Sequence, residues 1–217
     1  HFVFVSNWLY QMFLKFFNIE FEKIDQRKQI IYNSVGKKFE KNVYDSKSEK
    51  VYDFITIRNN LDGSKYAIDI VAKIAKINPK YIFCVIGKGN YFKYNEKPKN
   101  IVWIDKSLNH DEILIFLNKS TCALLPTRAD AQGVMACELA TFGIPLITSD
   151  IDVSREIFID FENVEFIDNK ADKIDIEPLY QNLINRLSIE KKIKRNKKYF
   201  SENTILKEIK LFEKIIN

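Results

Sequence analysis

The sequence predicts an α/β fold, a doubly wound parallel sheet with flanking helices. Between Asp53 and Asp168, short apolar runs alternate with longer stretches of helical spacing, which is the pattern of βαβ units. Of 217 residues, 46% are hydrophobic, which is enough for one sizeable core and excludes a disordered chain. The expected strands are Phe54–Ile57, Ile82–Ile86, Ile101–Ile104, Cys122–Leu125, Pro145–Thr148 and Val164–Ile167.

Two of the stretches between these strands carry helix-start signals. Ser64 is expected to cap the helix after the first strand, because a serine hydroxyl accepts from free amides at a helix start. The apolar face of that helix is Ile68, Val71, Ala72 and Ala75. Asn109, with Glu112 three residues later, predicts a capping box. The helix that follows it would bury Ile113, Phe116 and Leu117.

Two flanks lie outside the sheet, so the chain divides into three parts. Residues 1–45 predict a strand, an aromatic helix, a second strand at Gln29–Tyr32 and a polar linker. Residues 46–170 form the sheet domain, and residues 171–217 form two or three helices. The aromatic helix has the stripe Trp8, Leu9, Met12, Phe13, Phe16 and Phe17, and the last helix has the stripe Ile205, Ile209, Phe212 and Ile216.

Composition excludes several classes of protein. A net charge of +5 over 34 basic and 29 acidic residues is too small and too mixed to mark a nucleic-acid-binding protein. No apolar run approaches the roughly 20 residues of a membrane span. Cys84, Cys122 and Cys137 lie in apolar runs without a CxxC or Cys/His cluster, so they are expected to be small buried hydrophobic residues rather than metal ligands.

Two cations follow the first expected strand. In an open α/β sheet, ligands bind beyond the carboxyl ends of the strands, and Arg58 comes directly after Phe54–Ile57. Lys65 falls in the first turn of the next helix, where a cation opposes the helix dipole unless an anion is bound. Arg58 and Lys65 together suit a diphosphate. The alternative is that both are ordinary solvated surface charges.

Glu138 is the only charged residue between Asp130 and Asp150, in a small-residue stretch that must pack on the sheet. A buried carboxylate needs hydrogen-bond donors, which either the protein or the hydroxyls of a ligand would supply. Gly133 precedes this helix and would let an anion approach free backbone amides. The structural alternative is that Glu138 caps a neighbouring loop.

At this point five motifs, taken in order, resemble the family four retaining glycosyltransferases over about residues 2–160. They are the turn Ile31-Tyr32-Asn33-Ser34-Val35, the pair Arg58 and Lys65, the run Ile86-Gly87-Lys88-Gly89, the acid-x7-Glu motif of Asp130 and Glu138 led by Pro126, and the strand and turn of residues 143–150. The resemblance implies a Rossmann-like domain of the GT-B fold.

The resemblance also implies roles for single residues. Arg58 and Lys65 would bind the donor diphosphate, Glu138 the ribose hydroxyls, and Asp130 the donor sugar. Asp130 stands where the family usually has Glu. Further donor contacts are implied for the run Ile86-Gly87-Lys88-Gly89 and for the backbone amides at the helix start, which places Gly87, Gln132, Gly133, Val134 and Met135 in the donor site. Catalytic roles would fall to Asp130, Arg58 and Lys65, with no metal or other cofactor.

Enzymes of this family have two such domains, and the resemblance places this chain as the C-terminal, donor-binding half. A missing N-terminal GT-B domain, a nucleotide-sugar donor and a glycan or lipid-linked acceptor are the implied partners. The reaction would be retaining hexosyl transfer in bacterial cell-surface polysaccharide synthesis, such as capsule or lipopolysaccharide. The fragment alone would be inactive. The aromatic stripe of residues 8–17 is expected to pack against the missing half, with membrane insertion as the less favoured alternative.

Other interpretations stay open. A degenerate GT-B domain acting as a scaffold subunit, a sugar-nucleotide epimerase or a phosphorylase would share the fold. Asp150-Ile151-Asp152 spells a metal-binding DxD but follows a strand motif of the GT-B type, which argues against a metal there. The basic run Lys191, Lys192, Lys194, Arg195, Lys197 and Lys198 favours a solvated helix face over contact with anionic lipid. The expected location is cytoplasmic, with peripheral contact at the inner face of the membrane as an option.

Overall fold

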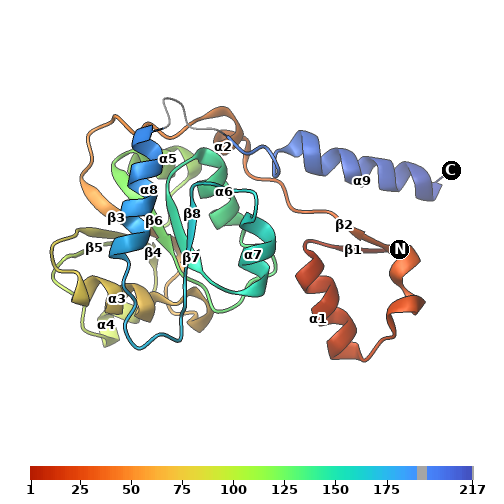
Figure 1. The fold of residues 1–217 in the computed structure, drawn as a ribbon, viewed down its shortest axis with the longest axis horizontal. Coiled ribbons are helices and arrows are strands. Elements are labelled where there is room, and N and C mark those ends of the chain that lie inside the picture. The colour runs from red at the N-terminus through yellow and green to blue at the C-terminus, as the bar shows by residue number, and fades with distance from the viewer. Residues whose placement is uncertain (190–194, 217) are drawn as a thin grey trace.

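The chain forms a six-stranded parallel sheet in the order β5-β4-β3-β6-β7-β8, seen in a computed structural model that describes residues 1–189 and 195–216 (Figure 1). Every neighbouring pair of these strands is parallel. The strands are β3 (Tyr52–Asn60), β4 (Phe83–Lys88), β5 (Ile101–Ile104), β6 (Ser120–Leu125), β7 (Leu146–Ser149) and β8 (Val164–Ile167). The predicted doubly wound α/β fold is confirmed, with each expected strand within a few residues of its place.

Helices cover both faces of the sheet (Figure 1). Apolar residues of α3 (Ile68–Ile77), α4 (Tyr91–Tyr94) and α8 (Glu177–Ile189) form one core cluster. Residues of α5 (His110–Asn118), α6 (Val134–Phe142) and α7 (Asp152–Phe158) form the other. Cys84, Cys122 and Cys137 are free and buried, as expected, and burial raises the pKa of all three thiols.

Two helix-start predictions had opposite outcomes. The capping box is confirmed, because Asn109 accepts from the Glu112 amide and Glu112 accepts from the Asn109 amide. The Ser64 cap is wrong. Ser64 begins a 3-10 turn, η3 (Ser64–Tyr66), and Ala67 then takes a left-handed conformation with φ of 52° before α3 starts at Ile68. Lys65 therefore lies in this turn and not in the first turn of the helix.

The placement of Arg58 after its strand also needs correction. Strand β3 continues to Asn60, which pairs with Lys88 after a register irregularity between Ile57 and Asn60. Arg58 lies within this irregular end of the strand. The irregularity brings the backbones of Arg58 and Gly87 so close that a Cβ on Gly87 would sit 2.1 Å from the Arg58 carbonyl oxygen.

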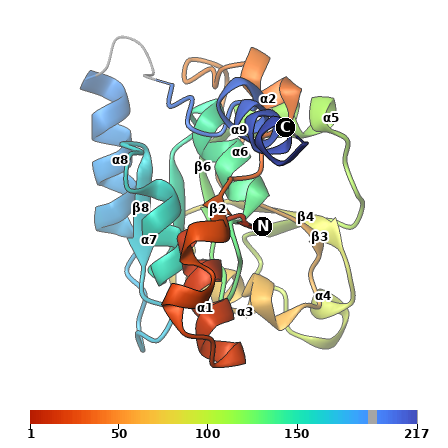
Figure 2. The same cartoon turned by 90° about the vertical axis from the view of Figure 1, so that its right-hand side faces the viewer.

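The N-terminal flank forms a small unit beside the sheet domain (Figures 1 and 2). Strands β1 (Phe2–Phe4) and β2 (Lys28–Ile30) pair in parallel, joined by α1 (Asn7–Phe17) and the turns η1 (Phe21–Lys23) and η2 (Asp25–Arg27). In α1, Leu9 and Phe13 pack on this unit and Trp8 packs on the sheet domain, whereas Phe16 and Phe17 are exposed. Only part of the aromatic stripe is therefore free to pack against the N-terminal domain that the resemblance implies.

The linker after β2 ends inside the sheet domain. It contains the short helix α2 (Lys37–Lys41), and Phe39 and Tyr44 are buried in the core cluster on the α6 side. The domain boundaries at residues 45 and 170 stay predictions.

The C-terminal flank contains α9 (Ser201–Ile216), which lies on the same side of the sheet domain as α1 (Figures 1 and 2). Its stripe is exposed at Ile205, Ile209, Phe212 and Ile216.

In the basic run, Lys191, Lys192 and Lys194 lie outside the described residues. The rest of the run is not helical, which corrects the expected helix face. Arg195 donates to carbonyls of α2 and Lys198 pairs with Asp160. Within the described residues, no helix is long and apolar enough to cross a membrane.

Candidate functional site

The candidate site lies between the carboxyl ends of β3 and β6. The strand order reverses between these two strands, and in open α/β sheets ligands bind at this switch point. A cavity of about 170 Å³ opens there, between the end of β3, the η3 turn and the start of α6. It is lined by Ile57, Arg58, Asn59, Lys65, Tyr66, Asp130, Gly133, Val134 and Met135. The structure thus brings six of the nine predicted site residues together.

Arg58 is a buried cation at the floor of this site. Its side chain is 8% exposed, and its Nη2 donates to the carbonyl oxygen of Pro126 at 2.7 Å. Its buried Nε has no hydrogen-bond partner, and no carboxylate of the described residues forms an ion pair with it. Burial lowers the pKa of Arg58 to about 10, although the negative charge of Asp130 opposes this shift. Arg58 is therefore charged at neutral pH, and no carboxylate of the described residues neutralises it.

Lys65 is brought to the site by hydrogen bonds between two loops. The carbonyl oxygen of Lys65 accepts from the Arg128 amide at 2.8 Å and from the Thr127 hydroxyl at 3.0 Å. Arg128 also donates to the Ser64 carbonyl oxygen and pairs with Asp69. The η3 turn is therefore fixed to the loop after β6, and Lys65 extends from it beside the cavity that Arg58 lines.

Asp130 shapes the loop that leads into α6. Its Oδ1 accepts from the amides of Ala131 at 2.8 Å and Gly133 at 2.9 Å, and from that of Gln132 at 3.4 Å. Gly133 then takes a left-handed conformation with φ of 74°, which glycine adopts without strain. The first helical bond runs from the Cys137 amide to the Gly133 carbonyl oxygen. The amides of Val134 and Met135 are thus left without intrahelical acceptors at the mouth of the cavity.

Glu138 lies one turn further along α6 and outside the lining of this cavity. It is 5% exposed, and its Oε1 accepts from the Gly36 amide at 3.0 Å. The Nε2 of His110 lies 3.9 Å from the same oxygen. Burial raises the pKa of Glu138, and the Gly36 amide and His110 oppose the shift. Glu138 does hold a neighbouring loop, and its Oε2 accepts no hydrogen bond from the described residues.

Gly87 and Gln132 do not line the main cavity. Gly87 has φ of 152° and supports the close approach of β4 to the Arg58 backbone. Gln132 is 4% exposed, and both ends of its side-chain amide bond the backbone of Asn33. It also lines a cavity of about 20 Å³ that includes Arg58 and Asp130.

Tyr66 and His110 were missed from the sequence. Tyr66 lines the cavity between Arg58 and Lys65, and His110 contacts the region of Gly36 and Glu138. The position of Tyr66 directly after Lys65 was the available signal. No comparable signal existed for His110, because its contacts come from distant parts of the chain.

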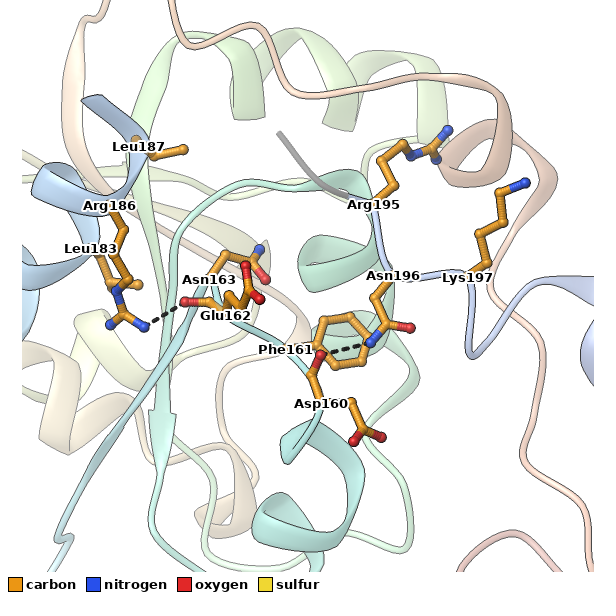
Figure 3. Close-up of a pocket in the computed structure, with 10 residues that line it drawn as sticks. All are labelled: Asp160, Phe161, Glu162, Asn163, Leu183, Arg186, Leu187, Arg195, Asn196 and Lys197. Atoms are coloured by element: carbon orange, nitrogen blue, oxygen red, sulfur yellow. Dashed lines mark hydrogen bonds between the residues drawn. The ribbon is translucent and has the colours of Figure 1, made fainter. Parts of the chain in front are cut away.

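Two other features of the structure, a second cavity and the DxD run, are not assigned a function. A cavity of about 400 Å³ lies at the amino end of β8, where Arg186 donates to the Glu162 carbonyl and Asn196 to the Asp160 carbonyl (Figure 3). Its lining includes Leu187 and Arg195, which flank the undescribed residues 190–194 in sequence, and we assign it no role. In the DxD run, the Asp150 carboxylate is paired with Arg155 on α7, which lowers the pKa of Asp150.

The fold and site define a class of protein: an α/β domain of Rossmann-like topology with two cations, Arg58 and Lys65, beside a cavity at its switch point. The comparisons with known proteins specify the family. Residues 37–200, which are 164 of the 217, match the family described as glycosyl transferases group 1. The chain belongs to this family.

Relatives agree with this assignment. An uncharacterized glycosyltransferase of Methanocaldococcus jannaschii, MJ1178, is 26% identical over 190 residues, which are 83% of this chain and 50% of the relative. The pneumococcal O-GlcNAc transferase GtfA, solved with UDP and GlcNAc, superposes on this chain with a TM-score of 0.67 at 16% identity. The alignment covers 100% of this chain and 45% of the GtfA chain.

WaaG, a glycosyltransferase involved in lipopolysaccharide biosynthesis, superposes with a TM-score of 0.62 at 14% identity. The alignment covers 86% of this chain and 53% of the WaaG chain. The chain therefore spans about half the length of these proteins. The Rossmann-like GT-B fold is confirmed, and the coverage is consistent with a C-terminal domain.

Proposed function

We propose that this chain is the donor-binding half of a retaining glycosyltransferase that transfers a hexose from a nucleoside-diphosphate sugar. The observation that carries the proposal is the buried Arg58 guanidinium, which has no counterion among the described residues and lines a cavity at the switch point of the sheet. Burying an unpaired charge is costly, so such a cation is best explained by an anionic ligand that completes it.

The proposed chemistry is stabilisation of the leaving diphosphate. Cleavage of the anomeric bond develops positive charge on the sugar and negative charge on the departing phosphate. Arg58, Lys65 and the amides of Val134 and Met135 surround one cavity, where fixed donors would stabilise that negative charge. Because these groups would balance the diphosphate, the proposal assigns no metal or other cofactor.

The remaining residues have proposed roles that follow their positions. Glu138 would bind the ribose hydroxyls through Oε2 while Oε1 holds Gly36. Asp130 would face the donor sugar, although its Oδ1 already accepts from loop amides and only Oδ2 remains for that contact. Gly87 and Gln132 would act indirectly, by supporting the Arg58 backbone and the linker. With these roles, the donor site would extend from α6 to the end of β3.

The acceptor-binding site and the second wall of the cleft would come from an N-terminal GT-B domain. The half-length coverage of the relatives supports this part of the proposal. A glycan or lipid-linked acceptor, hexose specificity, a bacterial cell-surface pathway and a cytoplasmic site with peripheral membrane contact are proposals that rest on the family resemblance. WaaG, which is involved in lipopolysaccharide biosynthesis, is a structural neighbour in keeping with that setting.

Calorimetric titration of the chain with uridine and guanosine diphosphates tests the proposal. We expect one of them to bind, weakly, because this half would supply only one wall of the cleft. Binding of neither would favour the scaffold alternative, which the engagement of Asp130 by its own loop also favours. In the complete enzyme, release of free nucleoside diphosphate on turnover would separate a transferase from an epimerase or a phosphorylase.

A further inference from the structure

The ring of Tyr66 lies between the two cations of the candidate site. Its centroid is 5.1 Å from the Arg58 guanidinium carbon and 4.7 Å from the Lys65 ammonium nitrogen. Both distances are within the range of cation–π contacts. Tyr66 is half-buried and lines the same cavity as the two cations.

The backbone that carries the ring is held by its surroundings. The Tyr66 amide donates to the Gly63 carbonyl oxygen at 2.9 Å, and a Cβ on Gly63 would meet the ring at 3.0 Å. On the following side, Ala67 closes the turn in a left-handed conformation. Because the turn is also bonded to Thr127 and Arg128 through the Lys65 carbonyl oxygen, the backbone from which the ring extends is held in place.

An aromatic ring can stabilise the buried Arg58 cation without neutralising its charge. A carboxylate against the guanidinium would neutralise its charge and compete with an anionic ligand. A ring face stabilises a cation through its quadrupole but leaves its net charge in place. The buried Nε of Arg58 has no hydrogen-bond partner among the described residues, so the ring face is a contact that leaves this donor open to an anionic ligand.

We propose that Tyr66 is a positioning residue that directs Arg58 and Lys65 toward one diphosphate. This inference rests on the proposed function and deepens it. The ring face carries the role, and the hydroxyl does not. Tyr66 thereby increases affinity for the diphosphate part of the donor without forming an ion pair itself.

The test is calorimetric binding of uridine and guanosine diphosphates by the full chain and three Tyr66 variants. Tyr66→Phe keeps the ring and should bind within about twofold of the wild type. Tyr66→Leu removes the ring and should bind roughly tenfold more weakly, in line with the strength of cation–π contacts. Tyr66→Met repeats the test in case Leu disturbs folding, which thermal unfolding reports. Tyr94→Leu, at a tyrosine that is 84% exposed, is the matched control.

The outcomes separate the inference from the function that it rests on. If the wild type binds neither diphosphate, the proposed function fails, and the inference with it. If the wild type binds and a folded Leu or Met variant binds equally well, the Tyr66 role is overturned while the donor site stands. An equal loss in the Phe and Leu variants would assign the effect to the hydroxyl and would also overturn it.

Discussion

The side-chain amide of Gln132 makes two hydrogen bonds with the backbone of Asn33. Its Oε1 accepts from the Asn33 amide at 2.6 Å, and its Nε2 donates to the Asn33 carbonyl oxygen at 3.0 Å. Gln132 precedes α6 at the candidate site, whereas Asn33 lies in the linker that follows β2. The loop that shapes the candidate cavity is therefore joined directly to the linker, and the Glu138 contact with Gly36 adds a second link.

Replacing Gln132 by Leu should destabilise the chain by about 1–2 kcal/mol. The substitution removes both bonds and leaves the polar groups of Asn33 without these partners. Urea denaturation measures the change. Gln181→Leu on the exposed side of α8 is the control and should cost less than about 0.5 kcal/mol. Equal effects of the two substitutions would show that the contact with Asn33 contributes nothing.

Gly87→Ala should cost more than about 3 kcal/mol, because its Cβ would lie 2.1 Å from the backbone oxygen of Arg58. Gly133→Ala is the matched comparison. Its nearest neighbour would be 3.6 Å away, so only the strain of φ at 74° remains, roughly 1 kcal/mol. Denaturation of both variants gives the order of the two effects. A smaller cost at Gly87 than at Gly133 would contradict the close approach of β4 to Arg58.

Relative to the wild type, the Glu138→Gln variant should be more stable at neutral pH than at acid pH. Burial raises the folded-state pKa of Glu138 above its ordinary value of 4.5. The folded state therefore binds the proton more tightly than the unfolded state, and stability falls as pH rises from about 4.5 through the raised pKa.

Gln keeps an acceptor for Gly36 but does not ionise. Denaturation of both proteins across this range should show the wild type losing stability relative to the variant as pH increases. Glu208→Gln on α9 is the control for the loss of one charge. A stability difference that is independent of pH would contradict a buried Glu138 carboxyl group with a raised pKa.

Local sequence signals predicted the strands and the capping box of Asn109 and Glu112, because short apolar runs and side chains three residues apart determine these features. Ser64 failed as a cap because the chain turns left-handed at Ala67, which caps the helix three residues later than expected. The true end of β3 was missed because its pairing resumes beyond an irregularity, which depends on Gly87 in another strand.

Within the site, the meeting of Arg58, Lys65 and Gly133 near the carboxyl ends of β3 and β6 could be predicted, although Arg58 lies within the end of β3 and Lys65 in the η3 turn. The function of the Gln132 side chain could not, since its partner Asn33 is 99 positions away. His110 and Gly36 likewise meet Glu138 only in the folded chain. Contacts between distant segments of this kind leave no periodicity in the sequence.

Arg58→Met should change stability by less than about 1 kcal/mol. The substitution removes a buried charge, which favours folding, but it also leaves the Pro126 carbonyl oxygen without its donor. Arg155→Met, at an exposed ion pair with Asp150, is the control for removal of an arginine and should also have a small effect. Urea denaturation of both variants checks this, and a large loss at Arg58 alone would assign it a structural role.

The central claim is that Arg58 binds the diphosphate of a nucleotide-sugar donor. Phosphorus NMR of uridine diphosphate, or of guanosine diphosphate if that one binds, tests it most directly when the wild type, Arg58→Met and Arg155→Met are each added. The predicted result is a shift of the phosphate resonances with the wild type and with Arg155→Met, and little or no shift with Arg58→Met. Equal shifts with all three proteins would contradict the claim.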